Sequence, residues 1–403
     1  MLKLKENVEL KNAVFIGVLC SISYLAVYFA RNILSTVTPE MVESGNFTTE
    51  KIGSLSSVYF ITYAFGQLIN GAIGDKIKSK YMISLGLIFA GVCNILFSFF
   101  SVTSWTLAYF SYAMTGFFLS MIYGPMTKVV AENTKPVYAT RCSLGYTFAS
   151  FFGSPLAGIA AVFIVWQGVF AVSSAVLVIM GIICFLFFSI FEKKGIVQYN
   201  KFNKPKEKGG SIKLLIKKQI IKFTLISVIT GIVRTTVVFW LPTYLSQYLG
   251  FDAETSALIF TVATLIISTT AFIAVFIYEK LGHNLNLTVL LSFISATVFF
   301  SAVFIVKQPV LNIIFIVLAI MSSNCAASML WSRYCPSLRD TGMVSGATGF
   351  LDFMSYMAAS VSSTLFANAV SDIGWGGLIF VWLLLMLVGV AICLPYKKIF
   401  HFE

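Results

Sequence analysis

Two arginines interrupt long apolar runs at matching places in the two halves of the chain. Arg31 lies in YFARNILSTVTPEMV and Arg234 in GIVRTTVVFWLPTYL, and a proline follows each arginine eight residues later. An arginine in a hydrocarbon layer is unfavourable and usually faces a polar cavity or a partner. A guanidinium stays charged and presents a planar fork of donors, which suits phosphate or carboxylate. The pair predicts a site for a doubly charged anion; for Arg31 alone, the alternative is a side chain that reaches the membrane interface.

Other polar side chains lie at helical spacing from the first arginine. Tyr24 and Tyr28 precede Arg31 by seven and three residues, so the three share one helical face. Tyr63 and Gln67 form a similar stripe on the next apolar segment. We expect these side chains to line a hydrated cavity that holds the substrate. For any single tyrosine the alternative is a packing or interface role.

Asp352 is a carboxylate well inside an apolar segment, SGATGFLDFMSYMAAS, and Tyr356 follows it on the same helical face. A buried acid in a membrane segment is functional by default, paired with an arginine or titrating as a proton carrier. The alternative is a fixed structural ion pair.

The polar loop GAIGDKIKSK carries an acid close to several basic residues. Asp75, Lys76 and Lys80 are predicted to form a cytoplasmic latch that breaks and remakes as two halves of the protein move. Membrane topology alone also explains part of this lysine content.

Composition places the chain in a lipid bilayer. Hydrophobic residues make up 58% and charged residues 11% of the chain, and the mean hydropathy is +0.90. Because lipid offers the backbone no hydrogen-bond partners, spans of this kind form helices. Twelve such spans are expected, near 13–37, 52–74, 81–100, 104–131, 138–163, 167–191, 219–247, 255–278, 286–306, 309–331, 342–369 and 374–396.

The positions of the basic residues predict the orientation. If the N-terminus is cytoplasmic, all but four of the 28 Lys and Arg residues lie on the cytoplasmic side; the exceptions are Lys51, Lys307 and the two membrane arginines. Both termini then lie in the cytoplasm, and the protein is expected to lie in the cytoplasmic membrane. The net charge of +12 reports this topology and gives no reason to expect a nucleic-acid partner.

The chain reads as two six-helix halves, 1–191 and 219–403, joined by a cytoplasmic linker over 192–218. Asp75-Lys76 and Glu279-Lys280 correspond at a spacing of 204 residues, close to the 203 that separate the two arginines. Such repeats are typical of alternating access around a site near the middle of the membrane. We expect a monomer.

Several motifs are missing from the chain. No GxxxxGK[ST] loop for ATP, no Cys/His metal spacing and no nucleophile motif are present. We therefore expect no enzyme activity, no cofactor and no metal, and transport energy from a gradient.

GAIGDKIKSK resembles the loop signature of the major facilitator superfamily. YFARNILSTVTPEMV, GFDAETSALIF and GATGFLDFMSYMAAS resemble the organophosphate:phosphate antiporters within it. The resemblance implies an all-α membrane protein with twelve transmembrane helices in two pseudo-symmetric six-helix bundles, the major facilitator fold. It also implies that Arg31 and Arg234 hold a phosphate and that tyrosines line the pocket, here Tyr24, Tyr28, Tyr63 and Tyr356.

The sequence departs from that family at several pocket positions. Asn32 and Gln67 stand where family members often have lysine, and Gly231 stands where they have tyrosine. Ser150 replaces a histidine, and Asp352 falls where relatives often have a small residue. The predicted pocket is therefore less positive than that of the family's sugar-phosphate carriers.

These observations predict a secondary transporter of a small anionic metabolite, an organophosphate such as a sugar phosphate or glycerol phosphate. Inorganic phosphate or a proton would be the coupled ion. One alternative is a proton-coupled carrier of a carboxylate or other small solute that uses Asp352. Another is a membrane sensor that binds a phosphorylated sugar without transporting it. A drug exporter fits two arginines poorly.

Overall fold

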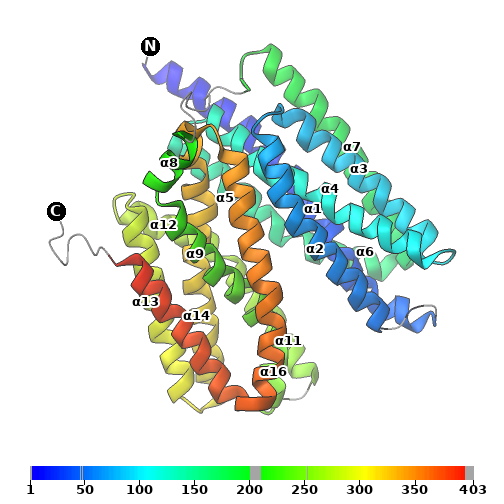
Figure 1. The fold of residues 1–403 in the computed structure, drawn as a ribbon, viewed down its shortest axis with the longest axis vertical. Coiled ribbons are helices and arrows are strands. Elements are labelled where there is room, and N and C mark those ends of the chain that lie inside the picture. Colours follow the sequence, from blue (N-terminus) through cyan, green and yellow to red (C-terminus); the bar gives the residue numbers. More distant parts are fainter. Residues whose placement is uncertain (1, 46, 48, 200–209, 252, 395–403) are drawn as a thin grey trace. The chain divides into compact units, whose positions relative to one another are not determined.

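The computed structural model describes residues 2–45, 47, 49–199, 210–251 and 253–394 (Figure 1). Every regular element within these ranges is a helix. In chain order the helices are α1 (Leu2–Glu43), α2 (Thr49–Gly74), α3 (Ser79–Phe100), α4 (Trp105–Asn133), α5 (Pro136–Phe151), α6 (Gly153–Phe163), α7 (Trp166–Lys193), α8 (Gly210–Lys217), α9 (Ile220–Gly231), η1 (Ile232–Val237), α10 (Val238–Gln247), α11 (Ala253–Ser268), α12 (Thr270–Lys280), α13 (Leu285–Ile305), α14 (Pro309–Met329), η2 (Leu330–Tyr334), α15 (Cys335–Ser337), η3 (Leu338–Thr341) and α16 (Val344–Cys393).

The chain divides into two compact units. Unit 1 contains Met1–Lys218 and Cys335–Phe353, and unit 2 contains Gln219–Tyr334 and Met354–Glu403. The long helix α16 therefore begins in unit 1 and continues in unit 2. The predicted linker over 192–218 falls partly outside the described residues, and the division into two sequence halves stays a prediction.

Small residues let the helices of unit 1 approach one another closely. The helix α3 packs against α4 and α7, α2 packs against α4, and α1 packs against α5, α6 and α7. A Cβ added to Gly91 of α3 would lie 2.9 Å from the backbone oxygen of Ser174 on α7. Small residues at such crossings are typical of membrane helix packing. Phe97, Tyr112 and Phe170 fill the space beside this crossing, and the ring centre of Phe97 lies 4.9 Å from that of Tyr112 and 4.8 Å from that of Phe170.

Polar side chains satisfy backbone groups in unit 2, where α14 packs against α13 and α12. The side-chain amide of Asn312 donates to the carbonyl oxygens of Val303 and Val306, at 2.9 and 2.8 Å. Its amide oxygen accepts a hydrogen bond from the Tyr244 hydroxyl. The fully buried Asn312 thus completes the hydrogen bonding at the C-terminal end of α13, which a lipid environment would otherwise leave unsatisfied.

Several long apolar segments are broken helices. The predicted segment 138–163 is divided into α5 and α6, and 219–247 into α9, the π-helix η1 and α10. Within α16 the backbone leaves helical geometry at Gly374, which has φ 66° and ψ 178°. Glycine reaches this region without a steric penalty, so Gly374 separates the predicted segments 342–369 and 374–396.

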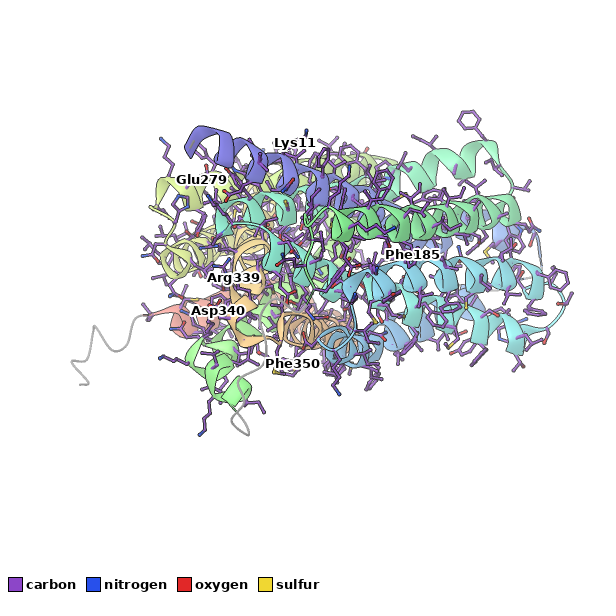
Figure 2. All side chains as sticks on the ribbon, turned by 90° about the horizontal axis from the view of Figure 1, so that it is seen from above. Lys11, Phe185, Glu279, Arg339, Asp340 and Phe350 are labelled. Carbon is purple, nitrogen blue, oxygen red and sulfur yellow. The ribbon has the colours of Figure 1, made fainter. Side chains whose placement is uncertain are left out.

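Helices occupy the twelve predicted segments, and in the part of the chain that the structure describes seven helical stretches are long and apolar enough to cross a membrane by length and composition. The other five predicted segments are 52–74, 104–131, 138–163, 219–247 and 342–369. Large apolar side chains also cover the outside of the helices. In unit 1, Phe185 and Phe350 are 41% and 36% exposed (Figure 2). An apolar outer surface of this kind fits a lipid surrounding.

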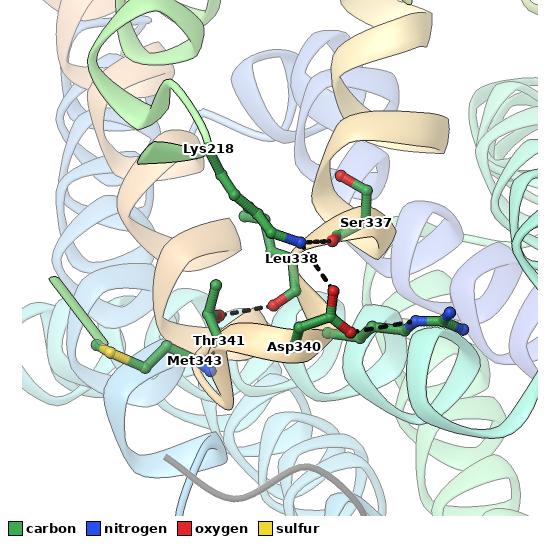
Figure 3. A network of polar contacts seen from close by, with 7 residues as sticks. Lys218, Ser337, Leu338, Asp340, Thr341 and Met343 are labelled. Carbon is green, nitrogen blue, oxygen red and sulfur yellow. Dashed lines mark hydrogen bonds and ion pairs between the residues drawn. The ribbon is translucent and has the colours of Figure 1, made fainter. Parts of the chain in front are cut away.

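A polar network ties the end of the predicted linker to the segment before α16. Lys218 donates from Nζ to the carbonyl oxygen of Ser337 at 2.9 Å and to Oδ2 of Asp340 at 3.0 Å (Figure 3). The other Asp340 oxygen lies 3.6 Å from Nε of Arg339. All four residues belong to unit 1, so the short helix α8 is anchored there at its C-terminal end.

Candidate functional site

Arg31 lies on α1 in unit 1, half-buried, among three aromatic rings. Its Cζ is 5.3 Å from the ring centre of Tyr28, 5.3 Å from Phe60 and 5.0 Å from Tyr63. Each such contact contributes about 0.5–2 kcal/mol, more when water is excluded. Rings hold a guanidinium through its faces, whereas its N–H donors point outward in its plane. The three rings therefore hold the Arg31 guanidinium in one place in unit 1. The planar arrangement of its N–H donors, which suits an anion, is preserved.

A cluster of tyrosines continues from Arg31 along α1. The ring centre of Tyr24 is 5.0 Å from Tyr28, 5.3 Å from Tyr123 on α4 and 5.9 Å from Tyr146 on α5. The Tyr146 hydroxyl shares a hydrogen bond of 2.7 Å with Ser143. The spacing from Arg31 predicts Tyr24 and Tyr28 but not Tyr123 and Tyr146. Each lies inside a predicted span, and a search for hydroxyl-bearing residues on every span would have found them.

Gln67 has no exposed surface, and neither its amide oxygen nor its amide nitrogen makes a hydrogen bond within the described residues. It lies one turn after Tyr63 on α2. The next polar residue on this stripe, Asn70, differs because its amide donates to Ser120 Oγ at 2.8 Å and to the Phe117 oxygen at 3.3 Å. A buried amide without partners costs about 1–3 kcal/mol. Such a group is typical of a place where water or a ligand completes the hydrogen bonding.

Asp352 lies close to this stripe in the part of α16 that belongs to unit 1. Asp352 is 6% exposed. One turn earlier, a Cβ on Gly349 would lie 2.1 Å from the backbone oxygen of Gln67. Backbone therefore meets backbone where α16 crosses α2, and Arg31, Gln67 and Asp352 all belong to unit 1.

Arg234 lies in unit 2, half-buried, within the π-helix η1. π-Helical turns are rare and often occur at functional sites. Tyr356, 8% exposed, is in the same unit. A Cβ on Gly231 would lie 2.3 Å from Oγ and 2.8 Å from the backbone oxygen of Ser355. A tyrosine cannot occupy this position in the present packing, which explains the glycine found there.

Asp75 binds the N-terminus of α16. Its Oδ1 accepts from the Ser345 N–H at 3.0 Å and its Oδ2 accepts from the Gly346 N–H at 3.1 Å. These are the second and third residues of the helix, whose N–H groups have no intrahelical partner. A carboxylate here also complements the helix dipole, a contribution of about 0.3–2 kcal/mol. The contact gives Asp75 a defined partner inside unit 1, while its role as a gate stays a prediction.

Lys128 supports Asp75 from the other side. Although α4 buries this lysine to 2% exposure, its Nζ donates to the backbone oxygens of Gly74 and Asp75, at 3.1 and 2.9 Å. From the sequence, Lys128 counts only among the basic residues that predict the membrane topology. Its place inside the predicted span 104–131 was the signal that could have found it, because a lysine within a span needs polar partners.

The lysines of the same loop bind within unit 1. Lys80 lies 2.5 Å from one Glu192 carboxylate oxygen and 3.5 Å from Ser189 Oγ. Lys78 lies 2.6 Å from the other Glu192 oxygen, and this hydrogen bond raises the pKa of Lys78. Lys76 is exposed. The structure thus places Lys80 on the end of α7, and Glu192 is a partner that the sequence analysis did not foresee.

No group of three or more His, Cys, Asp or Glu side chains that could hold a metal ion is found in the part of the chain that the structure describes.

Solved structures of membrane transporters share this fold. A bacterial homologue of the iron transporter ferroportin, in an outward-facing state, matches with a TM-score of 0.78 and 12% identity, over 95% of this chain and 99% of that chain. The transporter FucP in its outward conformation matches with a TM-score of 0.74 and 12% identity, over 95% and 98%. At this identity the likeness defines the fold alone, that of a multi-pass helical membrane protein.

The Major Facilitator Superfamily profile matches residues 20–363, and the chain belongs to this superfamily. The predicted fold class, an all-α membrane protein with the major facilitator fold, is thereby confirmed.

Three curated relatives are similar to this chain, and two of them are named as organophosphate transporters. The membrane sensor protein UhpC of Salmonella typhimurium is 35% identical over 97 residues, which are 24% of this chain and 22% of the relative. The glycerol-3-phosphate transporter of Bacillus subtilis is 25% identical over 62% of this chain and 60% of the relative. The phosphoglycerate transporter protein of Salmonella typhimurium is 23% identical over 96% and 88%. The chain thus spans less than two thirds of the length of the first two relatives. The resemblance to organophosphate carriers that the sequence motifs predict is confirmed.

Proposed function

We propose that this protein is a secondary transporter of a small organophosphate, with Arg31 and Arg234 as the two groups that bind the phosphate. The observation that carries the proposal is the setting of Arg31, whose guanidinium lies against Tyr28, Phe60 and Tyr63 within 5.3 Å of each ring centre. A transporter of glycerol-3-phosphate and one of phosphoglycerate among the relatives support this substrate class.

The proposed mechanism is alternating access between two halves, residues 1–191 and 219–403, joined by the linker over 192–218. Two positive charges that approach one another repel, so an empty site resists closure. A dianionic phosphate bound by both arginines removes this repulsion and shifts the population toward the closed state. Energy comes from a gradient of the substrate, of inorganic phosphate or of protons, with no enzymatic step.

Tyr24, Tyr28, Tyr63 and Tyr356 are assigned to the wall of the substrate cavity. Gln67 is assigned to the organic part of the substrate, because a neutral amide both donates and accepts hydrogen bonds. Its buried, unbonded amide supports this assignment. Asp75, together with Lys76 and Lys80, is assigned to the cytoplasmic gate.

A second candidate function is proton-coupled transport of a carboxylate or another small solute through Asp352. The nearly complete burial of Asp352 favours this candidate. An acid in such surroundings is a proton-carrier candidate in membrane transporters. Uptake driven by a pH gradient alone, and lost in Asp352→Asn, would establish it.

A sensor without transport is the third candidate, favoured by the 35% identity to the membrane sensor protein UhpC over a limited stretch. It binds ligand like a transporter but shows no flux. The longer matches to named transporters give it less support.

The proposed setting is the cytoplasmic membrane, with both termini in the cytoplasm and a monomeric protein. The distribution of basic residues supports the orientation. Labelling of single cysteines placed beside Lys78 and Lys307, in intact cells, tests it: the first should be shielded and the second accessible from outside.

One experiment separates the three functions. Purified protein is screened by thermal unfolding against glycerol-3-phosphate, phosphoglycerate, glucose-6-phosphate, inorganic phosphate and a dicarboxylate. A ligand at about 100 times its Kd adds about 2.7 kcal/mol of stability. Any stabilising compound is then tested for uptake into proteoliposomes. Stabilisation by an organophosphate together with its uptake supports the main proposal. Stabilisation by an organophosphate without uptake supports the sensor. Stabilisation by the dicarboxylate alone contradicts the organophosphate transporter and the sensor.

A further inference from the structure

An apolar groove runs along the outside of unit 1 between α1 and α5. It encloses about 310 Å³ and is lined on the α1 side by Leu10, Ala13, Val14, Gly17, Val18 and Ile22. Val14, Val18 and Ile22 are each about half exposed, at 51%, 52% and 48%. The stretch Val8–Leu34 is long and apolar enough to cross a membrane. The groove therefore opens toward the hydrocarbon of the bilayer rather than toward the tyrosine cluster.

Close helix packing forms the floor of this groove. The thiol of Cys142 on α5 lies 3.3 Å from the Ala13 carbonyl oxygen on α1, to which it donates. A Cβ on Gly17 would lie 2.9 Å from Cys142 Sγ, and one on Gly145 would lie 3.0 Å from Ser21 Oγ. Because small residues bring the two helices together here, the groove is a fixed feature of the fold and is not made by the rotamers of large side chains.

The surface of the groove is almost entirely apolar, but some of the residues that line it also carry polar groups. Tyr138 and the exposed Arg141, both on α5, line it together with the apolar residues. Just beyond, Lys135 forms an ion pair of 2.5 Å with Glu9, which joins the first turns of α5 to α1. The Arg141 guanidinium and the Tyr138 phenol thus belong to the first turns of α5, and the apolar α1 residues of the groove lie next to them.

The geometry points to a binding site for an anionic phospholipid. An acyl chain lies along α1 over Val14 and Val18, and the lipid phosphate binds the Arg141 guanidinium with the Tyr138 hydroxyl beside it. Arginine side chains at this depth extend toward the headgroups, where a planar fork of donors matches a phosphate. The excess of basic residues assigns the first turns of α5 to the cytoplasmic leaflet, where anionic lipids attract such groups.

A second groove on the same protein provides an internal comparison. The groove between α11 and α14 in unit 2 has a volume of about 450 Å³ and is lined by apolar side chains alone, including Ile259, Val262, Ile313 and Met321. It offers room for an acyl chain and no group that distinguishes one headgroup from another. Lipid selectivity therefore belongs to the Arg141 groove.

The test is lipid retention by the full-length protein, measured by native mass spectrometry in micelles with equal amounts of phosphatidylglycerol and phosphatidylcholine. The two lipids share the phosphate, but phosphatidylcholine carries a compensating ammonium. The expected preference for phosphatidylglycerol is about fivefold, equivalent to about 1 kcal/mol for one basic group at an anionic surface. Arg141→Gln should abolish this preference, whereas Lys280→Gln, which removes an exposed basic group at the end of α12, should retain it.

Val18→Trp fills the apolar part of the groove without touching the charge and should lower retention of both lipids. This variant also tests whether lipid occupies the groove if Arg141→Gln fails to fold. Equal retention of the two lipids by the wild-type protein, an unchanged preference in Arg141→Gln, or unchanged retention in Val18→Trp would each overturn the inference. None of these results bears on the phosphate-binding role of Arg31.

Discussion

The Asp75 carboxylate and the Ser345 backbone N–H, 270 positions apart in the chain, form a hydrogen bond of 3.0 Å. The second oxygen of Asp75 accepts from Gly346, so one side chain satisfies two N–H groups at the start of α16. This side chain belongs to the loop that the sequence analysis assigned to a gate. The structure gives that loop a specific partner, the N-terminus of a helix.

Replacing the Asp75 charge should loosen the start of α16. In Asp75→Asn the amide keeps the shape of the side chain but loses the negative charge that complements the dipole of α16. The loss should cost about 1 kcal/mol of stability. We expect a lower midpoint of thermal unfolding and faster labelling of a cysteine introduced at Ser345. Lys76→Gln, at an exposed position of the same loop, is the control and should change neither quantity. Equal effects of the two substitutions would show that the contact has no special role.

Gly349 should tolerate no side chain. In Gly349→Ala the new Cβ would lie 2.1 Å from the Gln67 backbone oxygen, so the helices must move apart. Overpacking of this kind destabilises by about 1–3 kcal/mol. Gly376→Ala, where a Cβ would meet nothing within 4 Å, is the matched control and should leave the thermal midpoint unchanged. A Gly349→Ala protein as stable as the control would contradict this packing.

Gln67 and Asn70 should respond in opposite ways to replacement by leucine. Gln67→Leu removes a buried amide that makes no hydrogen bond within the described residues, so stability without ligand should be unchanged or higher. Asn70→Leu removes hydrogen bonds to Ser120 and Phe117 and should cost about 1 kcal/mol for each. If Gln67 binds substrate, the gain in stability on adding an organophosphate should vanish in Gln67→Leu alone. A full ligand response in that variant would remove Gln67 from the site.

The sequence predicted the helices well because apolar runs in lipid have no alternative to helical structure. It also placed Tyr63 near Arg31, and the structure puts the Arg31 guanidinium 5.0 Å from the Tyr63 ring centre; the role of these residues stays a prediction. The positions where the helices break were harder to predict from the sequence. Gly374 takes a positive φ, but a glycine in a membrane span is often only a packing residue. Segment 219–247 gave no sign of the π-helix around Arg234.

Contacts between distant segments could not be predicted from local patterns. The approach of Gly349 to Gln67 and the bond between Asp75 and Ser345 depend on which helices pack together. Lys128 looked like one more cytoplasmic lysine, although its burial against Gly74 and Asp75 gives it a structural role. Tyr123 and Tyr146 are inconspicuous among 17 tyrosines until the fold brings them to Tyr24.

Arg31 and Arg234 are proposed to bind one phosphate during transport, and the decisive measurement is exchange of radiolabelled glycerol-3-phosphate in proteoliposomes. Arg31→Lys and Arg234→Lys keep the charge but lose the planar fork. Each should reduce exchange by a factor of about 10–100, equivalent to about 1.4–2.8 kcal/mol, while Lys280→Arg exchanges like the wild type. Wild-type rates in either arginine variant, for every organophosphate that the wild-type protein transports, would contradict the account.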